Sequence, residues 1–171
     1  MTYLAPLLES GGQSPTAAGL VVALYGIGLL LASRVVKRQI SRVRPEVLIA
    51  VGATLLVVAY LLIAVSQTPV AVGIGATLVG AGWASMHSTM QAWATEVVPG
   101  ARAAMVSLFA GALFLGSGAA TAALAPLAGE HRWTVMFTGA VVISAVFGVV
   151  AAVTRSRYRP AMTAATITSA P

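Results

Sequence analysis

The residues with the richest side-chain chemistry lie near the end of an apolar run at positions 69–93. His87 follows Trp83 by four residues and precedes Gln91 by four, so these three side chains share one face of a helix. Ser88 and Met90 flank that face. Such a face offers aromatic, polarizable and hydrogen-bonding groups to a partly apolar ligand, so we predict a substrate-cavity wall there. The alternative is that His87 forms a hydrogen bond between two helices.

The same stretch does not predict an enzyme. Ser85 and His87 point about 200° apart on a helix, so they cannot form the hydrogen bond that joins a nucleophile to its base. The other histidine, His131, lies in a different segment, and the sequence has no cysteine. The sequence patterns of hydrolase nucleophiles, zinc proteases and phosphate-binding loops are also missing from it. We therefore predict no catalytic residue, no cofactor and no metal site.

Composition defines the environment in which this face must work. Of the 171 residues, 58% are hydrophobic and only 8% are charged, which excludes a water-soluble globular protein and a disordered chain. The net charge of +6 would suit a nucleic-acid protein only if the basic residues covered a solvated surface. Most of the chain carries no basic residue. We predict that the chain sits in a lipid bilayer and binds no nucleic acid.

Long uncharged runs predict the elements that position the polar face. Each run is long enough for one membrane crossing of about 20 residues, and the longest, which residues 66–69 interrupt, is long enough for two. Ser14 before Pro15 and Thr68 before Pro69 are typical helix starts. The sequence thus predicts an all-α integral membrane protein with spans at about 16–33, 46–65, 69–93, 101–125 and 133–153.

Basic residues gather at one end of these spans. They are Arg34, Lys37, Arg38, Arg42 and Arg44 after the first span, Arg102 after the third, and Arg155, Arg157 and Arg159 after the fifth. The segments at the opposite end contribute only Arg132. Because basic residues near span ends stay in the cytoplasm, we predict a multi-pass plasma-membrane protein with its N-terminus outside and its C-terminus inside. The uncharged residues 160–171 are expected to form a disordered tail.

Residues 1–15 form an outer segment ahead of the bundle, which we place at residues 16–159. Its apolar part, Tyr3–Leu8, is too short to span a membrane and is preceded by no basic region of the kind that begins a signal peptide. We interpret it as the outer end of a missing helix. A frayed surface terminus is the alternative.

Small residues recur at helical spacing on several spans. Membrane helices use such residues to bring two backbones close together. We therefore predict helix-packing faces, or interfaces that slide past one another, at these glycines. The pairs seven residues apart are Gly19 with Gly26, Gly73 with Gly80, Gly75 with Gly82, and Gly111 with Gly118, and Gly116 extends the last of them.

Three features resemble the C-terminal half of a major facilitator superfamily transporter, over about residues 2–157. They are the outer segment Tyr3–Ser14 before Pro15, the basic loop Arg34–Arg44, and Glu96-Val-Val-Pro99-Gly-Ala-Arg102 leading into a Gly-rich span. The drug:proton antiporter and sugar-efflux branches are the most similar. The resemblance implies that the five spans correspond to helices eight to twelve, preceded by the end of helix seven. It also implies cytoplasmic signature residues at Arg34, Lys37, Arg38, Arg42, Pro99 and Arg102.

The basic loop departs from that family's pattern. Ala32 or Ser33 stands where a glycine is usual, and no aspartate precedes Arg38. A charge-relay role for this loop in gating is therefore not implied.

The resemblance implies part of a secondary active transporter, an exporter of amphipathic small molecules that works by alternating access and is proton-coupled. Its partners would be the small-molecule substrate and either a missing N-terminal half or a second copy of the chain. A sugar or metabolite permease half is the alternative within transport. A non-transporting membrane scaffold or an inert truncated fragment is the alternative outside it.

Overall fold

The computed structural model describes residues 1–158, and all of its regular structure is helical. A short helix, α1 (Leu4–Ser10), precedes five long ones. The long helices are α2 (Pro15–Gln39), α3 (Pro45–Val65), α4 (Pro69–Val97), α5 (Arg102–Gly129) and α6 (Trp133–Arg157), with a 3-10 turn, η1 (Pro99–Ala101), between α4 and α5. All five are long and apolar enough to cross a membrane. The predicted all-α membrane fold is confirmed, and the predicted tail lies outside the described residues.

The predicted helix starts form as side-chain caps. The hydroxyl oxygen of Ser14 accepts a hydrogen bond from the Ala17 amide at 3.3 Å, and that of Thr68 accepts one from the Ala71 amide at 3.3 Å. A proline follows each cap, where its missing N–H costs nothing. These caps explain why α2 and α4 begin where the sequence predicts.

Four of the five long helices end further along the chain than predicted, whereas α3 ends at Val65 as predicted. α2 continues to Gln39 instead of ending near residue 33, so Arg34, Lys37 and Arg38 are helical and do not belong to a loop. α4 and α6 extend by one turn, to Val97 and Arg157. An uncharged run marks the part of a helix inside the bilayer, whereas a helix continues into water until a breaker or a cap ends it.

α5 also passes its predicted end. It continues through Pro126 to Gly129, because a proline in the last turn removes only one amide donor.

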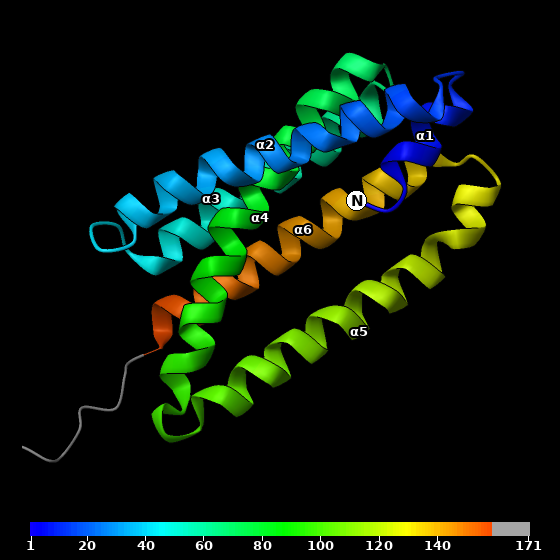
Figure 1. The fold of residues 1–171 in the computed structure, drawn as a ribbon. Coiled ribbons are helices and arrows are strands. Elements are labelled where there is room, and N and C mark those ends of the chain that lie inside the picture. Colours follow the sequence, from blue (N-terminus) through cyan, green and yellow to red (C-terminus); the bar gives the residue numbers. More distant parts are fainter. Residues whose placement is uncertain (159–171) are drawn as a thin grey trace, which may run out of the picture.

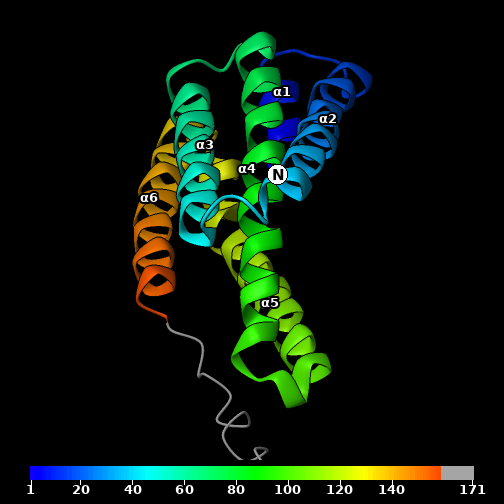
Figure 2. The same cartoon turned by 90° about the vertical axis from the view of Figure 1, so that its left-hand side faces the viewer.

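Helix α4 is the central element of the bundle. It packs most extensively against α2 on one side and α3 on the other, and α3 also packs along α6 (Figure 2). Most of the apolar part of α4 is buried. Helix α5 differs, because it touches α4 and α6 only sparsely and has no buried residue (Figure 1).

Glycines explain how closely the helices approach α4. A Cβ on Gly80 would collide with the backbone of Tyr25, and one on Gly28 would collide with the backbone of Thr77. On the other side, a Cβ on Gly52 would lie 2.8 Å from the Gly82 carbonyl oxygen, and one on Gly82 would lie 2.7 Å from that of Gly52. Backbones therefore touch directly at both interfaces.

The predicted glycine faces are only partly used for packing. Gly75 lies against Ile63, and Gly73 and Gly80 contact α2. The other predicted positions have nothing within 4 Å of a Cβ, so within this chain they pack against no helix: Gly19, Gly26, Gly111, Gly116 and Gly118. Spacing of seven identifies a face of a helix but not the neighbour that covers it, and sequence analysis did not single out Gly28 and Gly52.

Helix α1 is not a frayed terminus. Leu4, Leu7 and Leu8 are almost completely buried in a core cluster with residues of α2, α3, α4 and α6. The Tyr3 hydroxyl donates a hydrogen bond to the Thr121 carbonyl oxygen of α5, and the Trp133 indole N–H of α6 donates one to the Ser10 hydroxyl at 3.0 Å. α1 thus ties α5 and α6 together at one end of the bundle.

Candidate functional site

A cavity of about 420 Å³ lies among α3, α4, α5 and α6. Aromatic and aliphatic side chains form nearly all of its wall. They come from four helices: Leu56 of α3; Trp83, Met86, His87 and Met90 of α4; Phe109, Ala112 and Leu113 of α5; and Ile143, Ser144 and Phe147 of α6. Ser144 and His87 are the polar residues of this wall, and no charged side chain lines it.

His87 is held by stacked rings. Its imidazole lies 5.0 Å from the Trp83 ring, centroid to centroid and nearly parallel, as expected for residues four apart on a helix. On the opposite helix, Phe109 of α5 tilts against the imidazole at 5.3 Å. Nδ1 of His87 is buried and has no hydrogen-bond partner among residues 1–158. A buried nitrogen without a partner costs free energy, so a ligand that satisfies it gains affinity.

The structure places three of the five predicted cavity residues in this wall. Trp83, His87 and Met90 line it, whereas Ser88 and Gln91 do not. Residues four apart drift by about 40° around a helix, so Gln91 has turned away from the face that Trp83 defines. Whether the three lining residues bind a substrate remains a prediction.

The remaining polar residues of α4 have structural partners. The Ser85 hydroxyl donates to the Ala81 carbonyl oxygen at 3.0 Å, and the Thr89 hydroxyl donates to that of Ser85 at 2.8 Å. These bonds stay within the helix, and both side chains are buried against neighbouring helices. They satisfy the hydroxyl groups without a ligand.

Sequence analysis missed the residues that α5 and α6 contribute to the cavity. Helix periodicity finds a face on one helix but not the residues that another helix places opposite it. Phe109 offered a weak signal, since it is a large aromatic residue on a helix rich in alanine and glycine. Ser144 was the corresponding polar residue in the last span.

A second cluster joins the ends of α4 and α6. The Arg155 guanidinium lies 2.9 Å from the Glu96 carboxylate and packs over the rings of Trp93 and Tyr158, at 5.5 and 5.4 Å from their centroids. The Arg155 side chain is only 12% exposed. Sequence analysis treated Arg155 only as a charge that sets orientation, but here it is a structural clamp.

The predicted signature residues do not gather into one site. Arg34, Lys37, Arg38, Arg42 and Arg102 are all exposed, and Pro99 begins the turn η1. Across residues 1–158, no three histidine, aspartate or glutamate side chains come together in a way that would hold a metal ion.

Five helices long and apolar enough to cross a membrane make this a multi-pass membrane protein, and four of them, α3 to α6, line an apolar cavity. The profile of the Major Facilitator Superfamily matches residues 1–169, and the chain belongs to that family. Members of this family are transporters and not enzymes. Comparison with curated proteins and with solved structures gives no match.

Proposed function

We propose that the chain is part of a secondary active transporter that exports amphipathic small molecules by alternating access. The observation that carries this proposal is the wall of the cavity, which is almost entirely aromatic and aliphatic apart from His87 and Ser144. Such a wall suits a ligand with a large apolar body and one or two hydrogen-bonding groups. Alternating access is proposed because the chain belongs to this transporter family, and transporters of this kind expose a central site to the two sides of the membrane in turn.

The proposed coupling ion is the proton, and the proposed proton carrier within this chain is His87. It is the only histidine of the cavity wall, and imidazole is the side-chain group whose ordinary pKa lies closest to neutral pH. Its Nδ1 is buried and has no hydrogen-bond partner among residues 1–158, so the nitrogen is not already committed to another protein group.

A sugar permease half is the second candidate in transport. Sugars require many hydrogen-bonding groups around each ring, because every hydroxyl must exchange its water for a protein partner. The two polar residues of the cavity wall are too few for that task, which favours the amphipathic ligand.

Transport of a fluorescent apolar cation by the reconstituted full-length product tests the proposal. We expect His87→Asn to lower the transport rate about tenfold, because the imidazole stack and its proton are both lost. His131→Asn is the matched control, since His131 has a positive φ of 56°, which asparagine tolerates, and does not line the cavity. Equal transport rates for wild type and His87→Asn with every tested compound would remove His87 from the proposed substrate-cavity wall, whereas no transport of any compound, including sugars, by the wild type would favour the non-transporting scaffold.

We also propose that a second helical bundle, an N-terminal half or another copy of the chain, covers α5. No residue of α5 is buried, and Leu108, Phe114 and Leu115 are 67%, 75% and 78% exposed.

Cross-linking in membranes tests the covering bundle on a tagged chain expressed from its native locus. If the second half is fused to the chain, we expect the tagged product at more than twice 17.3 kDa. If a second copy covers α5, we expect a band near 17.3 kDa that shifts to twice 17.3 kDa after cross-linking. A single band near 17.3 kDa under efficient cross-linking would contradict both forms of the covering bundle.

The proposed orientation places the N-terminus outside the plasma membrane and the C-terminus in the cytoplasm. Its support is the distribution of charge, because the exposed basic residues at the ends of α2 and α6 lie on one side of the predicted membrane.

A further inference from the structure

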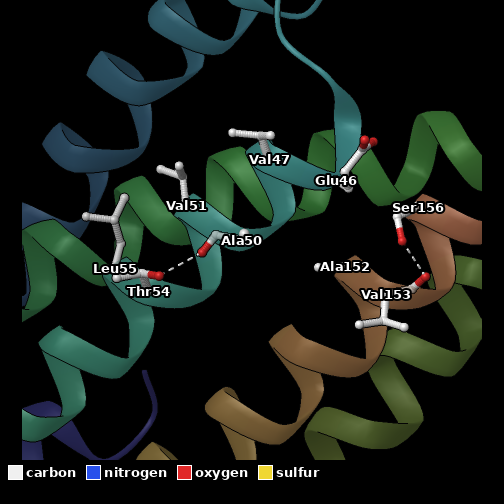
Figure 3. A pocket seen from close by; sticks show the side chains of 9 residues that line it. All are labelled: Glu46, Val47, Ala50, Val51, Thr54, Leu55, Ala152, Val153 and Ser156. Carbon is white, nitrogen blue, oxygen red and sulfur yellow. Dashed lines mark hydrogen bonds between the residues drawn. The ribbon is translucent and has the colours of Figure 1, made fainter.

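A groove of about 580 Å³ runs between α3 and α6, away from the cavity that contains His87 (Figure 3). Its wall consists mainly of small and aliphatic side chains, including Val47, Ala50 and Val51 of α3 and Ala152 and Val153 of α6. Because this groove opens to the outside of the bundle, it faces the acyl chains when the helices span a membrane.

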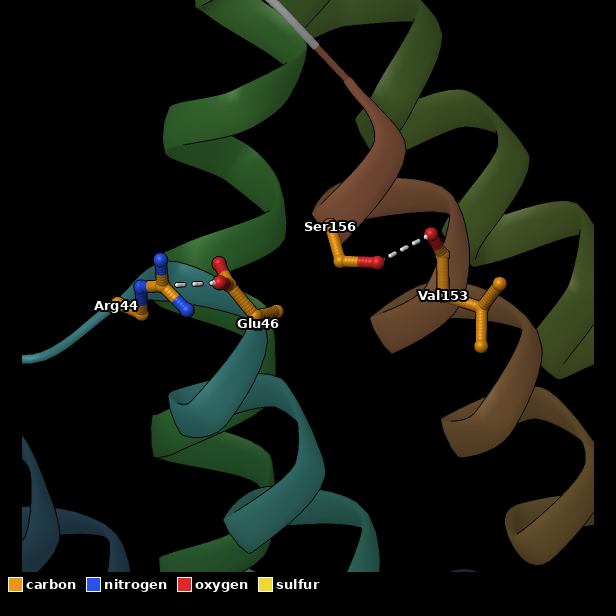
Figure 4. A network of polar contacts seen from close by, with 4 residues as sticks. All are labelled: Arg44, Glu46, Val153 and Ser156. Atoms are coloured by element: carbon orange, nitrogen blue, oxygen red, sulfur yellow. Dashed lines mark hydrogen bonds and ion pairs between the residues drawn. The ribbon is translucent and has the colours of Figure 1, made fainter.

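The two hydroxyl groups in the groove wall already have hydrogen-bond partners within the chain. The Thr54 hydroxyl donates to the Ala50 carbonyl oxygen at 2.9 Å, and the Ser156 hydroxyl donates to that of Val153 at 2.8 Å, as Figures 3 and 4 show. Both hydroxyls are satisfied by their own helices. The inner surface of the groove therefore behaves as an apolar surface.

The groove is as long as one leaflet is deep. It continues into an adjoining hollow of about 390 Å³ that reaches Val57 on α3 and Gly148 on α6. From Glu46 to Val57, α3 rises about 16 Å at 1.5 Å per residue. One leaflet of the hydrocarbon core is about 15 Å deep, so an acyl chain lying in the groove would be contained along its length.

Two arginines come directly beyond the wall residues at one end of the groove, Arg44 shortly before Glu46 on α3 and Arg157 directly after Ser156 on α6. The Arg44 side chain is 84% exposed and lies 3.7 Å from the Glu46 carboxylate, which is the acidic group of the groove wall (Figure 4). Arg157 is exposed and follows Val153 by one turn on the same face of α6. Arg44 balances the charge of Glu46, and Arg157 adds an unbalanced positive charge.

We propose that this groove binds one anionic phospholipid from the leaflet at this end of the bundle. One acyl chain lies between α3 and α6, and the phosphate lies between Arg44 and Arg157. Exposed arginines attract anionic headgroups at a membrane surface, and an apolar groove below them makes that attraction specific to one position. The site is separate from the transport cavity, so it stands whether or not the proposed export function does.

The headgroup part of the proposal is tested by native mass spectrometry of the full chain in detergent, with phosphatidylglycerol and phosphatidylcholine added in turn. We expect one phosphatidylglycerol to remain bound, with little phosphatidylcholine. Arg44→Gln and Arg157→Gln should each weaken binding about fivefold. Arg34→Gln on α2 removes the same charge outside the groove and should leave binding unchanged. Equal binding of both lipids, or an equal effect of Arg34→Gln, would overturn the proposed site.

The acyl-chain part of the proposal is tested by filling the groove. Ala50 is exposed, so Ala50→Phe places a ring in the groove without entering the helix interface, and we expect retention of phosphatidylglycerol to fall at least fivefold. Ala23→Phe, at an exposed alanine of α2, is the matched control. Unchanged binding in Ala50→Phe would overturn the groove as the lipid site. A dimer that Ala50→Phe dissociates would assign the groove to a second copy instead.

Discussion

Gly80→Ala is expected to destabilise the helix bundle by about 3 kcal/mol, the upper part of the usual range for overpacked cores. The added methyl group would meet the backbone of Tyr25, and a backbone cannot move aside by changing a rotamer. The helices α2 and α4 must therefore separate along their whole contact. Thermal unfolding of the purified chain, followed by circular dichroism in detergent, measures the effect.

Gly26→Ala is the control for this prediction. Gly26 lies on α2, the partner helix of the same interface, but has nothing within 4 Å of a Cβ. Alanine stabilises a helix relative to glycine by up to about 1 kcal/mol, so this variant should melt at the same temperature as wild type or slightly above it. Similar melting of the two variants would show that the backbones of α2 and α4 do not touch in the membrane protein.

Arg155→Gln is expected to cost about 2 kcal/mol of stability. The substitution removes the ion pair with Glu96 and the packing of the guanidinium over two rings, each worth about 1 kcal/mol for a side chain as little exposed as Arg155. The expected loss of stability is no larger than about 2 kcal/mol because Glu96 is 47% exposed, and solvent weakens its attraction to Arg155.

A double-mutant cycle with Glu96→Gln isolates the ion pair within this effect. If Arg155 acts as a clamp, the two single variants and the double variant should show a coupling of at least about 0.5 kcal/mol. Arg157→Gln, two residues further along α6 and exposed, should change the melting temperature little in lipid-free detergent. Additive losses from Arg155→Gln and Glu96→Gln would contradict a direct pair.

The number, the type and the starting residues of the long helices could be predicted from the sequence, because they depend on local signals. Long apolar runs require helices in a membrane, and Ser14 and Thr68 cap the helices that follow them. The ends of α2 and α6 were less predictable, because charged residues such as Arg38 and Arg155 mark where a helix leaves the bilayer and not where it stops.

Only the part of the candidate site that α4 contributes could be predicted from the sequence. The four-residue spacing placed Trp83 beside His87, and their rings stack as that spacing requires. Phe109 lies against the same imidazole from another helix, and no local pattern pairs residues that are far apart in the sequence. The same reason explains why the ion pair between Glu96 and Arg155 was not predicted, because these two residues lie on different helices that are far apart in the sequence.

The two sides of the cavity wall differ in how tightly their helices are packed. On one side, α4 is fixed against α2 and α3 by direct backbone contacts at Gly80 and Gly82. On the other side, α5 follows the turn η1 at its start and accepts the Tyr3 hydrogen bond at Thr121, and it packs only sparsely against α4 and α6. A helix packed sparsely along its length is displaced more easily than one in backbone contact with two neighbours, so the α5 side of the cavity is the softer side and the side that carries His87 is the rigid one.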